Sequence, residues 1–467
     1  MICFFGVLVE YLVKILDLNN VVVKKECHLV WSSVPLARTS PSRRILCDRS
    51  RMTAAKRTFT SGAFRSRRRR SVLKAYNLLS SMFGEAATSL LFNKTGTSSK
   101  PPRQQPMNWQ AREDSLNDRQ FLARYRMSKA AFHELVRLCR PYLPVRRKAR
   151  ADSVTPEVAL SMTLRWLAGG SYLDICDVHN VRESCFFVTK SRTLEAMKKG
   201  LKAEIRFPET EEERAKVAAG FAAYSNGALR GCLSSLDGLA VQIHEPTKKD
   251  TPNPAGFKNR KGFFAILVQA MCDSDRLFTY VSVKHQGSCH DSTAFDSCPF
   301  SCGLADLVPS GYWIAADDAY GCTEKIITPH PGSHEHHSPK DSFNFWQSSA
   351  QRIYIECTFG ILVRRWGVLW RPLECRLKEN CSTIYVCMLL HNFCSRRGAH
   401  VVMCREEGEV DAAGGAPDVF LQNELHMETQ TGRRRDLESS ILRAELTAGL
   451  HAGGFRRPNV NRRPASS

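Results

Sequence analysis

Five acidic side chains in the middle of the chain could carry out hydrolytic chemistry together. Asp237, Asp291, Asp317, Asp318 and Glu356 follow apolar runs or stand on a predicted helix. If these elements end at one edge of a sheet, several carboxylates would repel one another there unless a divalent cation lay between them. Oxygen ligands suit Mg²⁺ or Mn²⁺, and two such ions could bind the attacking and leaving oxygens of a phosphoryl transfer. One explanation of the pattern is therefore a metal-dependent catalytic site.

Each acid also has a purely structural explanation. Asp237 could start a turn, Asp291 could cap a helix, and Asp317 with Asp318 could close a strand. Glu356 could pair with a basic residue one helical turn earlier. Taken one at a time, the acids favour the structural explanation, and the metal site stays an alternative.

The segment that holds these acids, residues 231–395, has the pattern of an α/β domain. Runs of apolar residues with strand spacing occur at 231–246, 262–272, 277–285 and 311–320. The turn residues 273–275 make a hairpin of the second and third runs. Helical patterns follow at 348–366 and 381–394. We therefore predict a mixed sheet flanked by helices.

Residues 116–230 are predicted to be helical, with a connector from 206 onward. Apolar residues recur every three or four positions, and Ser128 is placed to cap a helix. The order of predicted elements is that of a helix-turn-helix: a break at two glycines, then a short helix, a turn and a longer helix over 182–197. Its second helix would present Arg182, Lys190 and Arg192 to a DNA groove. An ordinary helical bundle explains the spacing equally well.

The charge of the chain predicts a nucleic-acid partner. The 467 residues carry a formal net charge of +21, of which +13 lies in residues 1–115. We predict a basic, disordered arm and linker over 1–115 and a disordered tail over 396–467. The run Arg65 with Arg67, Arg68, Arg69 and Arg70 is typical of a nuclear-import signal or of an arm that binds phosphates. We therefore expect a nuclear protein, and a cytoplasmic pool is compatible with the sequence.

Other features narrow the class of protein. The 18 cysteines are scattered without a CxxC motif, as expected for reduced thiols inside a cell. The apolar run at the start is interrupted by Glu10 and Lys14, and no stretch is long enough to predict a membrane span, so we expect no membrane partner. The histidines at 330, 334, 336 and 337 lie in a Pro/Gly/Ser loop, which favours a flexible insert over a zinc site.

Six ordered motifs resemble one known family. They are SLDGLAVQIHEP, FKNRKGFFAILVQAMCD, HQGSCHDS, AADDAY, RIYIECTFGILVRRW and CMLLHNF. Together they resemble the catalytic domain of PIF/Harbinger transposases and Harbinger transposase-derived nucleases, a branch of the DDE endonuclease superfamily. Two upstream segments resemble the helical N-terminal region of that family, so the resemblance covers about residues 118–395.

The resemblance implies an RNase H-like α/β fold and a DNA-cutting site with two divalent cations, Mg²⁺ or Mn²⁺. By motif, Asp237, Asp317 and Glu356 correspond to catalytic residues of the family, and Asp291 to a fourth metal ligand. Asp318 is the alternative to Asp317 if the register differs by one residue.

Basic residues beside these motifs are candidates for binding DNA phosphates. Lys258, Arg260 and Lys261 precede the second strand, and Arg364 and Arg365 follow Glu356 on its helix. A solvated helix face would explain the same residues.

The motifs depart from the family pattern at two places. Leu239 and Ala240 follow the Asp-Gly pair where the family has Thr-His, and Gly321 replaces an expected proline. A second hypothesis is therefore a catalytically silent, domesticated nuclear protein that binds DNA or recruits a partner. The resemblance also implies a separate DNA-binding partner protein, and a homo-oligomer is compatible with it.

Overall fold

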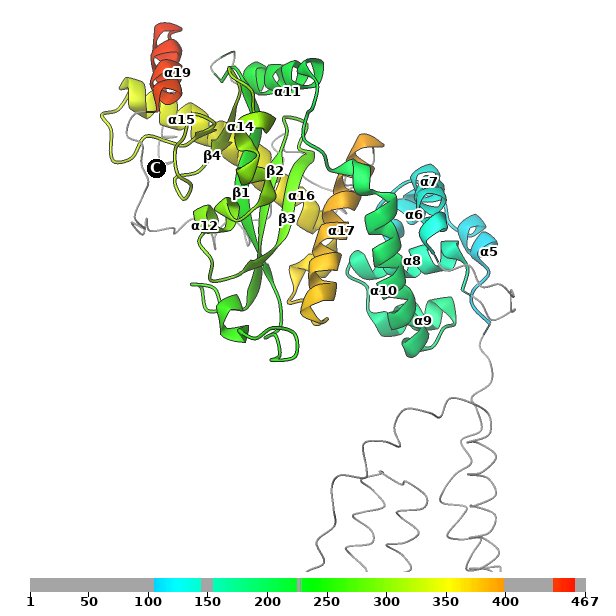
Figure 1. The fold of residues 1–467 in the computed structure, drawn as a ribbon. Coiled ribbons are helices and arrows are strands. Elements are labelled where there is room, and N and C mark those ends of the chain that lie inside the picture. The colour runs from blue at the N-terminus through cyan, green and yellow to red at the C-terminus, as the bar shows by residue number, and fades with distance from the viewer. Residues whose placement is uncertain (1–104, 144–153, 225–226, 228, 399–439, 458–467) are drawn as a thin grey trace, which may run out of the picture. The chain divides into compact units, whose positions relative to one another are not determined.

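The computed structural model describes residues 105–143, 154–224, 227, 229–398 and 440–457 (Figure 1). All of them lie in one unit, Gln104–Ser467. The basic run at 65–70 lies outside the described residues, so the structure does not bear on the predicted import signal. Within the described residues, no helix has both the length and the apolar composition that a membrane crossing needs.

Six helices and a short 3-10 turn build the N-terminal part of the described chain. They are α5 (Trp109–Asp114), α6 (Asp118–Tyr125), α7 (Lys129–Cys139), the 3-10 turn Arg140–Tyr142, α8 (Pro156–Leu167), α9 (Tyr172–His179) and α10 (Glu183–Gly200). Side-chain caps set several helix starts: Ser128 Oγ accepts the amide N–H of Ala131, as predicted, and Asn117 and Gln120 form a capping box.

The helical part has an aromatic centre. The ring of Trp109 stacks on that of Phe132 at 4.7 Å, and both pack against the rings of Phe121 and Tyr125. These side chains are buried. Because Trp109 lies on α5, this helix belongs to the core rather than to a disordered linker, and the prediction of disorder is wrong for its residues.

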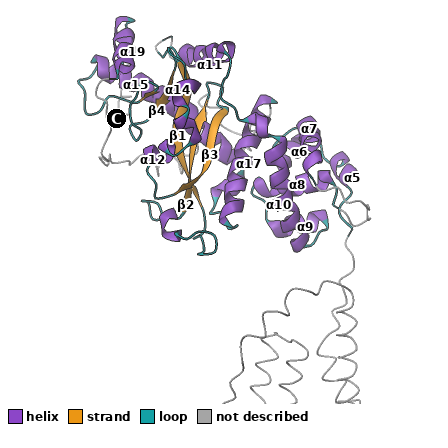
Figure 2. Cartoon of the chain, in the orientation of Figure 1, coloured by secondary structure: helices purple, strands orange, loops and turns teal. Residues whose placement is uncertain are grey.

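A five-stranded mixed sheet follows (Figure 2). Its strands are β1 (Cys232–Gln242), β2 (Ala265–Cys272), β3 (Phe278–Gln286), β4 (Trp313–Ala316) and β5 (Ile326–Ile327), in the order β3-β2-β1-β4-β5. β2 pairs antiparallel with β1 and β3, whereas β4 pairs parallel with β1 and β5. Asp273 Oδ1 accepts the amide N–H groups of Asp275 and Leu277 and so forms the predicted β2–β3 turn.

Helices and short helical turns make up the rest of this part of the chain, and several of them cover the two faces of the sheet (Figure 2). They are the 3-10 turn Lys202–Glu204, α11 (Glu211–Tyr224), the 3-10 turn Pro254–Phe257, α12 (Asp291–Asp296), α13 (Pro299–Cys302), α14 (Leu304–Leu307), α15 (Pro339–Gln351), the π-helical turn Arg352–Glu356, α16 (Cys357–Arg365), the 3-10 turn Gly367–Trp370, α17 (Leu377–Arg396) and α19 (Ile441–Ala452). The alternation along β4 shows why two cores form, because Trp313 and Ala315 face one core while Ile314 and Ala316 face the other. The predicted mixed sheet with flanking helices is thus confirmed.

One long helix joins the two parts of the chain. α17 packs against β3 on one side and against α10 on the other (Figure 1). Its central residues, among them Cys387, Leu390 and Phe393, are buried in the core that also holds the N-terminal helices. The helices and the sheet therefore share one hydrophobic core.

The C-terminal segment departs from the prediction. Residues 440–457 were predicted to belong to a disordered tail, yet α19 packs against α15. Glu324 accepts the amide N–H groups of Ile441 and Leu442 at 2.9 and 3.1 Å and so anchors the start of the helix. The Gly/Ala-rich composition of the surroundings concealed this helix.

Candidate functional site

Two of the predicted acids are placed side by side by the sheet register. β1 and β4 run parallel, and Leu236 pairs with Ala316. Asp237 is the next residue on β1, and Asp317 directly follows the end of β4, so both lie at the same level of the sheet. Their carboxylates are held by local backbone donors: Gly238 N–H donates to Asp237 Oδ1 at 2.7 Å, and Ala319 N–H donates to Asp317 Oδ1 at 3.0 Å.

Asp291 reaches the same place from α12. It is the first residue of that helix, and Gln269 Nε2 donates to its Oδ1 at 2.9 Å. Gln269 lies on β2 directly opposite Gly238 of β1. Asp291 is packed so closely on this backbone that a Cβ on Gly238 would overlap its Oδ1.

Glu356 comes from the helix that crosses behind the sheet. It ends the π-helical turn between α15 and α16, and this turn contacts β1 and β2. A π turn contains one extra residue and is frequent at functional sites. The structure describes Glu356 as partly buried.

The four carboxylates act on one another electrostatically. Burial raises the pKa of Asp237 well above its usual range, and the charges of Asp317, Asp291 and Glu356 raise it further. Burial, followed by the charges of Asp291, Asp318 and Glu356, raises the pKa of Asp317 to about 7. Burial also raises the pKa of Asp291. At neutral pH, positive charge near these groups would favour their ionised forms.

The donor set fits a hard divalent cation by its chemistry. All four side chains offer oxygen, as Mg²⁺ and Mn²⁺ prefer, and their mutual repulsion is the condition that a cation relieves. Among the described residues, no group of three or more His, Cys, Asp or Glu side chains is arranged so that it could hold a metal ion. The residues thus match the predicted cation in type and neighbourhood, while their side chains do not form a closed cage.

The predicted phosphate-binding residues fall into two groups. Arg182, Arg192, Lys258, Arg260 and Lys261 are exposed, and Arg364 is partly exposed. Arg260 lies on the loop before β2, and its charge lowers the pKa of Asp291 against the effect of burial. Arg260 is therefore one basic candidate with an electrostatic link to the acids.

Lys190 and Arg365 are corrections, because both are buried. Lys190 is 2 % exposed; its Nζ pairs with Glu379 Oε1 at 2.7 Å and lies 4.1 Å from the ring centre of Trp166. Arg365 Nη1 donates to the backbone carbonyl of His391 at 3.3 Å within the core. These cations join helices to one another, so they do not face a DNA groove in this structure.

The turn between α9 and α10 separates two helices as predicted, but the exposed face is apolar in part. Tyr172, Leu173, Val178, Phe187 and Val188 are large hydrophobic residues that are more than a third exposed. Sequence reasoning assigned this face to DNA through its cations, and it missed the apolar residues between them. The role of the α9–α10 pair in reading DNA stays a prediction.

Two further residues of the acid cluster were missed by sequence reasoning. Gln269 and Tyr320 are buried, and Tyr320 Oη donates to Gln269 Oε1 at 2.7 Å. The signal for Gln269 was its position as the one amide in the apolar strand AILVQAMC, and Tyr320 closes the quoted motif AADDAY.

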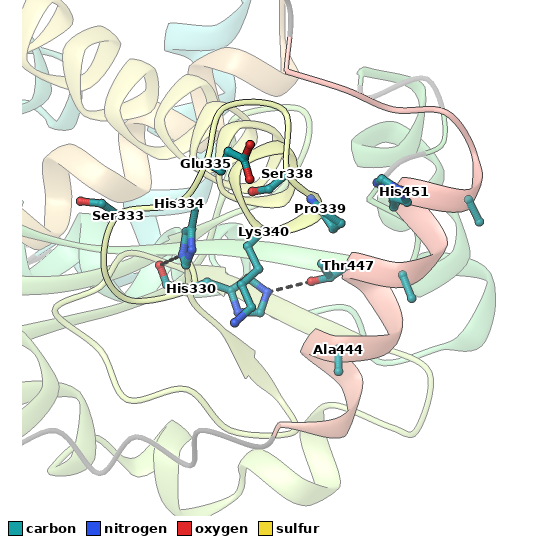
Figure 3. A pocket seen from close by; sticks show the side chains of 12 residues that line it. His330, Ser333, His334, Glu335, Ser338, Pro339, Lys340, Ala444, Thr447 and His451 are labelled. Atoms are coloured by element: carbon teal, nitrogen blue, oxygen red, sulfur yellow. Dashed lines mark hydrogen bonds between the residues drawn. The ribbon is translucent and has the colours of Figure 1, made fainter.

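A separate cavity of about 720 Å³ lies between α19 and the loop before α15 (Figure 3). His330, His334, Lys340 and His451 line it, together with three alanines of α19, and none of the four acids does. His330 Nε2 contacts Thr447 Oγ1 at 2.8 Å, and burial lowers the pKa of His330 to about 4. His330 thus joins the loop to α19 as a neutral ring.

Comparisons with known proteins bear on the domain that holds the acids. Searches of curated proteins and of solved structures found no match. A family comparison did find one, and its span contains all four carboxylates together with Gln269 and Tyr320. Residues 236–392 match the family model of the DDE superfamily endonuclease.

Proposed function

We propose that this chain is a divalent-metal-dependent DNA endonuclease of the PIF/Harbinger transposase type. The observation that carries the proposal is the convergence of four acids inside a segment that matches a DDE superfamily endonuclease: Asp237 and Asp317 at neighbouring strands, Asp291 packed on Gly238, and Glu356 on a turn that contacts β1 and β2. The six motifs that resemble the Harbinger branch support the finer assignment.

The proposed roles of the acids follow from their positions. Asp237, Asp317 and Glu356 would be the catalytic ligands, with Asp291 as a fourth ligand from α12. Two bound cations would supply the positive charge that activates a water and stabilises the departing oxygen in an in-line hydrolysis. The water would give up a proton as its oxygen forms a bond to phosphorus, the P–O bond to the leaving strand would break, and the departing oxygen would take up a proton and leave as a free DNA end.

The proposed DNA contacts are the exposed cations. Lys258, Arg260 and Lys261 lie on one loop, and the charge of Arg260 already reaches Asp291. They would hold the phosphates of the strand to be cut. Arg364, and Arg182 with Arg192 on α10, would contact the backbone farther along the duplex.

A cleavage assay on the full chain tests the function. With Mn²⁺ present, the purified protein should cleave DNA that carries free ends. The variants Asp237→Asn, Asp317→Asn and Glu356→Gln should each lower the cleavage rate by about a hundredfold or more. Asp318→Asn tests the register, because it should cleave like the wild type if Asp317 is the ligand. Asp296→Asn, an exposed acid at the end of α12, is the matched control.

Equal cleavage by all variants would refute the catalytic assignment. No cleavage by the wild type, together with tight and salt-sensitive DNA binding, would instead support the silent DNA-binding protein. The exposed apolar residues of α9 and α10 are the observation that favours this second candidate, because such residues are suited to a partner protein or a second copy of the chain.

We also propose a nuclear location, which rests on the arginine run at 65–70. A fluorescent fusion of the full chain should accumulate in the nucleus. Replacement of Arg65 and Arg67–Arg70 by alanine should shift it to the cytoplasm, and an unchanged distribution would remove the import assignment.

A further inference from the structure

We propose that Tyr320 and Gln269 form a hydrogen-bond relay that positions Asp291 in the acid cluster. The two are positioning residues, since they act on a candidate ligand rather than on substrate. The proposal rests on the proposed function, because it deals with the geometry of the same site.

The direction of the relay follows from what each group can donate. Asp291 as a carboxylate only accepts hydrogen bonds, so the group of Gln269 that faces it at 2.9 Å must be the amide NH₂. The carbonyl oxygen of Gln269 then faces Tyr320, whose hydroxyl donates to it at 2.7 Å. If the amide were turned around, two acceptor oxygens would meet at Asp291. Tyr320 therefore fixes the orientation in which Gln269 can hold the carboxylate.

The burial of both residues argues for a specific role. Gln269 is 0 % exposed and Tyr320 is 4 % exposed. On β2 the neighbours Val268 and Ala270 are apolar and fully buried. A buried amide costs free energy unless both its ends are hydrogen-bonded, and here both ends are bonded. An apolar residue would pack equally well on this strand. The function of the amide is therefore its hydrogen bond to Asp291.

The relay also connects the acids to one another. The amide N–H of Tyr320 donates to the carbonyl of Asp317 at 3.3 Å, so its ring starts from the turn that holds that carboxylate. Gln269 lies opposite Gly238, the residue after Asp237. Through two side chains, the turn at Asp317 and the strand at Asp237 thus determine where Asp291 lies.

Tyr320 has a structural contact that must be kept apart from the relay. Its ring packs edge-on against Phe295 of α12 at 6.1 Å. Tyr320→Phe keeps this ring and removes only the hydroxyl. Tyr312→Phe is the matched control, since the Tyr312 hydroxyl donates to Glu211 at 2.6 Å, away from the acids.

Mn²⁺ affinity of the full chain, measured by electron paramagnetic resonance of the free ion, is the first readout. Tyr320→Phe and Gln269→Leu should each weaken Mn²⁺ binding about tenfold, as loss of an orienting partner does at metal sites. The double variant should bind like Gln269→Leu alone, because the hydroxyl acts only through the amide. Tyr312→Phe should bind like the wild type.

The outcomes separate the relay from the proposed function. If Asp291→Asn weakens Mn²⁺ binding while Gln269→Leu and Tyr320→Phe do not, the relay is overturned and the metal site stands. If the wild type binds no Mn²⁺, the proposed metal chemistry fails, and the relay is tested by melting temperatures instead.

The melting-temperature shifts of the single variants Tyr320→Phe and Asp291→Asn should then not add up in the double variant. Additive shifts would overturn the relay.

Discussion

Gly238 illustrates at the level of one residue how tightly the acid cluster is packed. The space that a side chain would take there is filled by Asp291 Oδ1. The constraint is steric, because the backbone of Gly238 is not among those with positive φ in the described chain.

Gly238→Ala should therefore displace Asp291 while leaving the β1–β2 pairing intact. We expect cleavage to fall by about a hundredfold, since a misplacement of about 1 Å has such an effect in enzymes. The rate of DNA cleavage, with far-ultraviolet circular dichroism as the control for folding, checks this. A variant that folds and cleaves normally would contradict the packing described for Asp291.

Lys190 gives the opposite kind of prediction, a loss of stability without loss of DNA binding. Lys190→Met removes the ion pair with Glu379 and the contact with the Trp166 ring. Because the Glu379 side chain keeps some solvent exposure, we expect the free energy of unfolding to fall by about 2 kcal/mol. Urea denaturation measures this.

The surface variant Arg192→Ala, on the exposed side of α10, is the matched control for Lys190. It should leave the urea midpoint unchanged and weaken DNA binding instead. Weaker DNA binding by Lys190→Met at unchanged stability would restore the groove-facing position that the sequence predicted for this lysine.

These residues show what residue types can reveal about a site. Asp237, Asp317 and Glu356 stand in motifs with apolar flanks, so their neighbourhood could be predicted. Lys190 and Arg365 have the same charge as the exposed arginines beside them, and helical spacing alone does not tell which side meets α17. Gln269 stands out in the sequence as the one amide of an apolar strand, but its role became visible only from its burial between two hydrogen-bond partners.

At the level of elements, the π-helical turn before α16 determines how Glu356 faces the sheet. An α-helix turns by about 100° per residue. The extra residue of the π turn therefore changes the rotation of α16, and of Glu356 before it, relative to α15. The sequence predicted one continuous helix here, because side-chain periodicity over a few residues does not reveal one inserted residue.

Deletion of Ile353 should convert the π turn into α-helix and rotate Glu356 relative to α15. We expect helix content to persist and cleavage to be lost. Circular dichroism and the cleavage assay measure the two together. Full activity of the deletion variant would mean that the π turn does not place Glu356.

The α8–α9 contact carries a pH dependence through His179. Its ring is buried, with Nδ1 2.8 Å from the Ile175 carbonyl oxygen and Nε2 3.0 Å from Ser161 Oγ. Burial lowers the pKa of His179 to about 4, whereas an unfolded histidine titrates near 6.5. As the pH falls from 7 toward 4, the unfolded state takes up the proton and the folded state does not, so stability decreases over this window.

The contribution of His179 should be about 2 kcal/mol between pH 7 and pH 5. His179→Gln should reduce the change in the free energy of unfolding between these two pH values by that amount, as measured by urea denaturation. A slope identical to that of the wild type would show that His179 is already protonated, or exposed, in the folded chain.

The strands were easier to predict than the short or isolated elements. β1, β2 and β3 have eight or more residues each, and the turn that joins β2 to β3 has an aspartate with an evident role. β5 has two residues, too few for any periodicity. α5 and α19 were missed because their surroundings are polar or Gly/Ala-rich, while their order comes from distant partners such as Phe132 and Glu324.

At the level of the whole molecule, charge is distributed unevenly between the described fold and the rest. The chain has a net charge of +21, and residues 1–115 account for +13 of it. The acids of the candidate site thus stand in the less basic part of the chain.

Alanine in place of Arg65 and Arg67–Arg70 should make DNA binding less sensitive to salt. If all five arginines contact phosphates, the slope of the logarithm of affinity against that of salt concentration should become less negative by about 4.5. Fluorescence anisotropy at several salt concentrations measures the slope. The same change at Arg433–Arg435 is a comparison, and an unchanged slope for the first variant would exclude the run from the DNA interface.

The position of α17 has a consequence for how this protein could be divided or recombined. Because one helix packs against both β3 and α10, neither half can be expressed alone without exposing buried apolar side chains to water. The N-terminal helices are therefore not an exchangeable module. A chimera that joins them to another catalytic domain would have to carry α17 along, and heating the intact protein should melt both halves together.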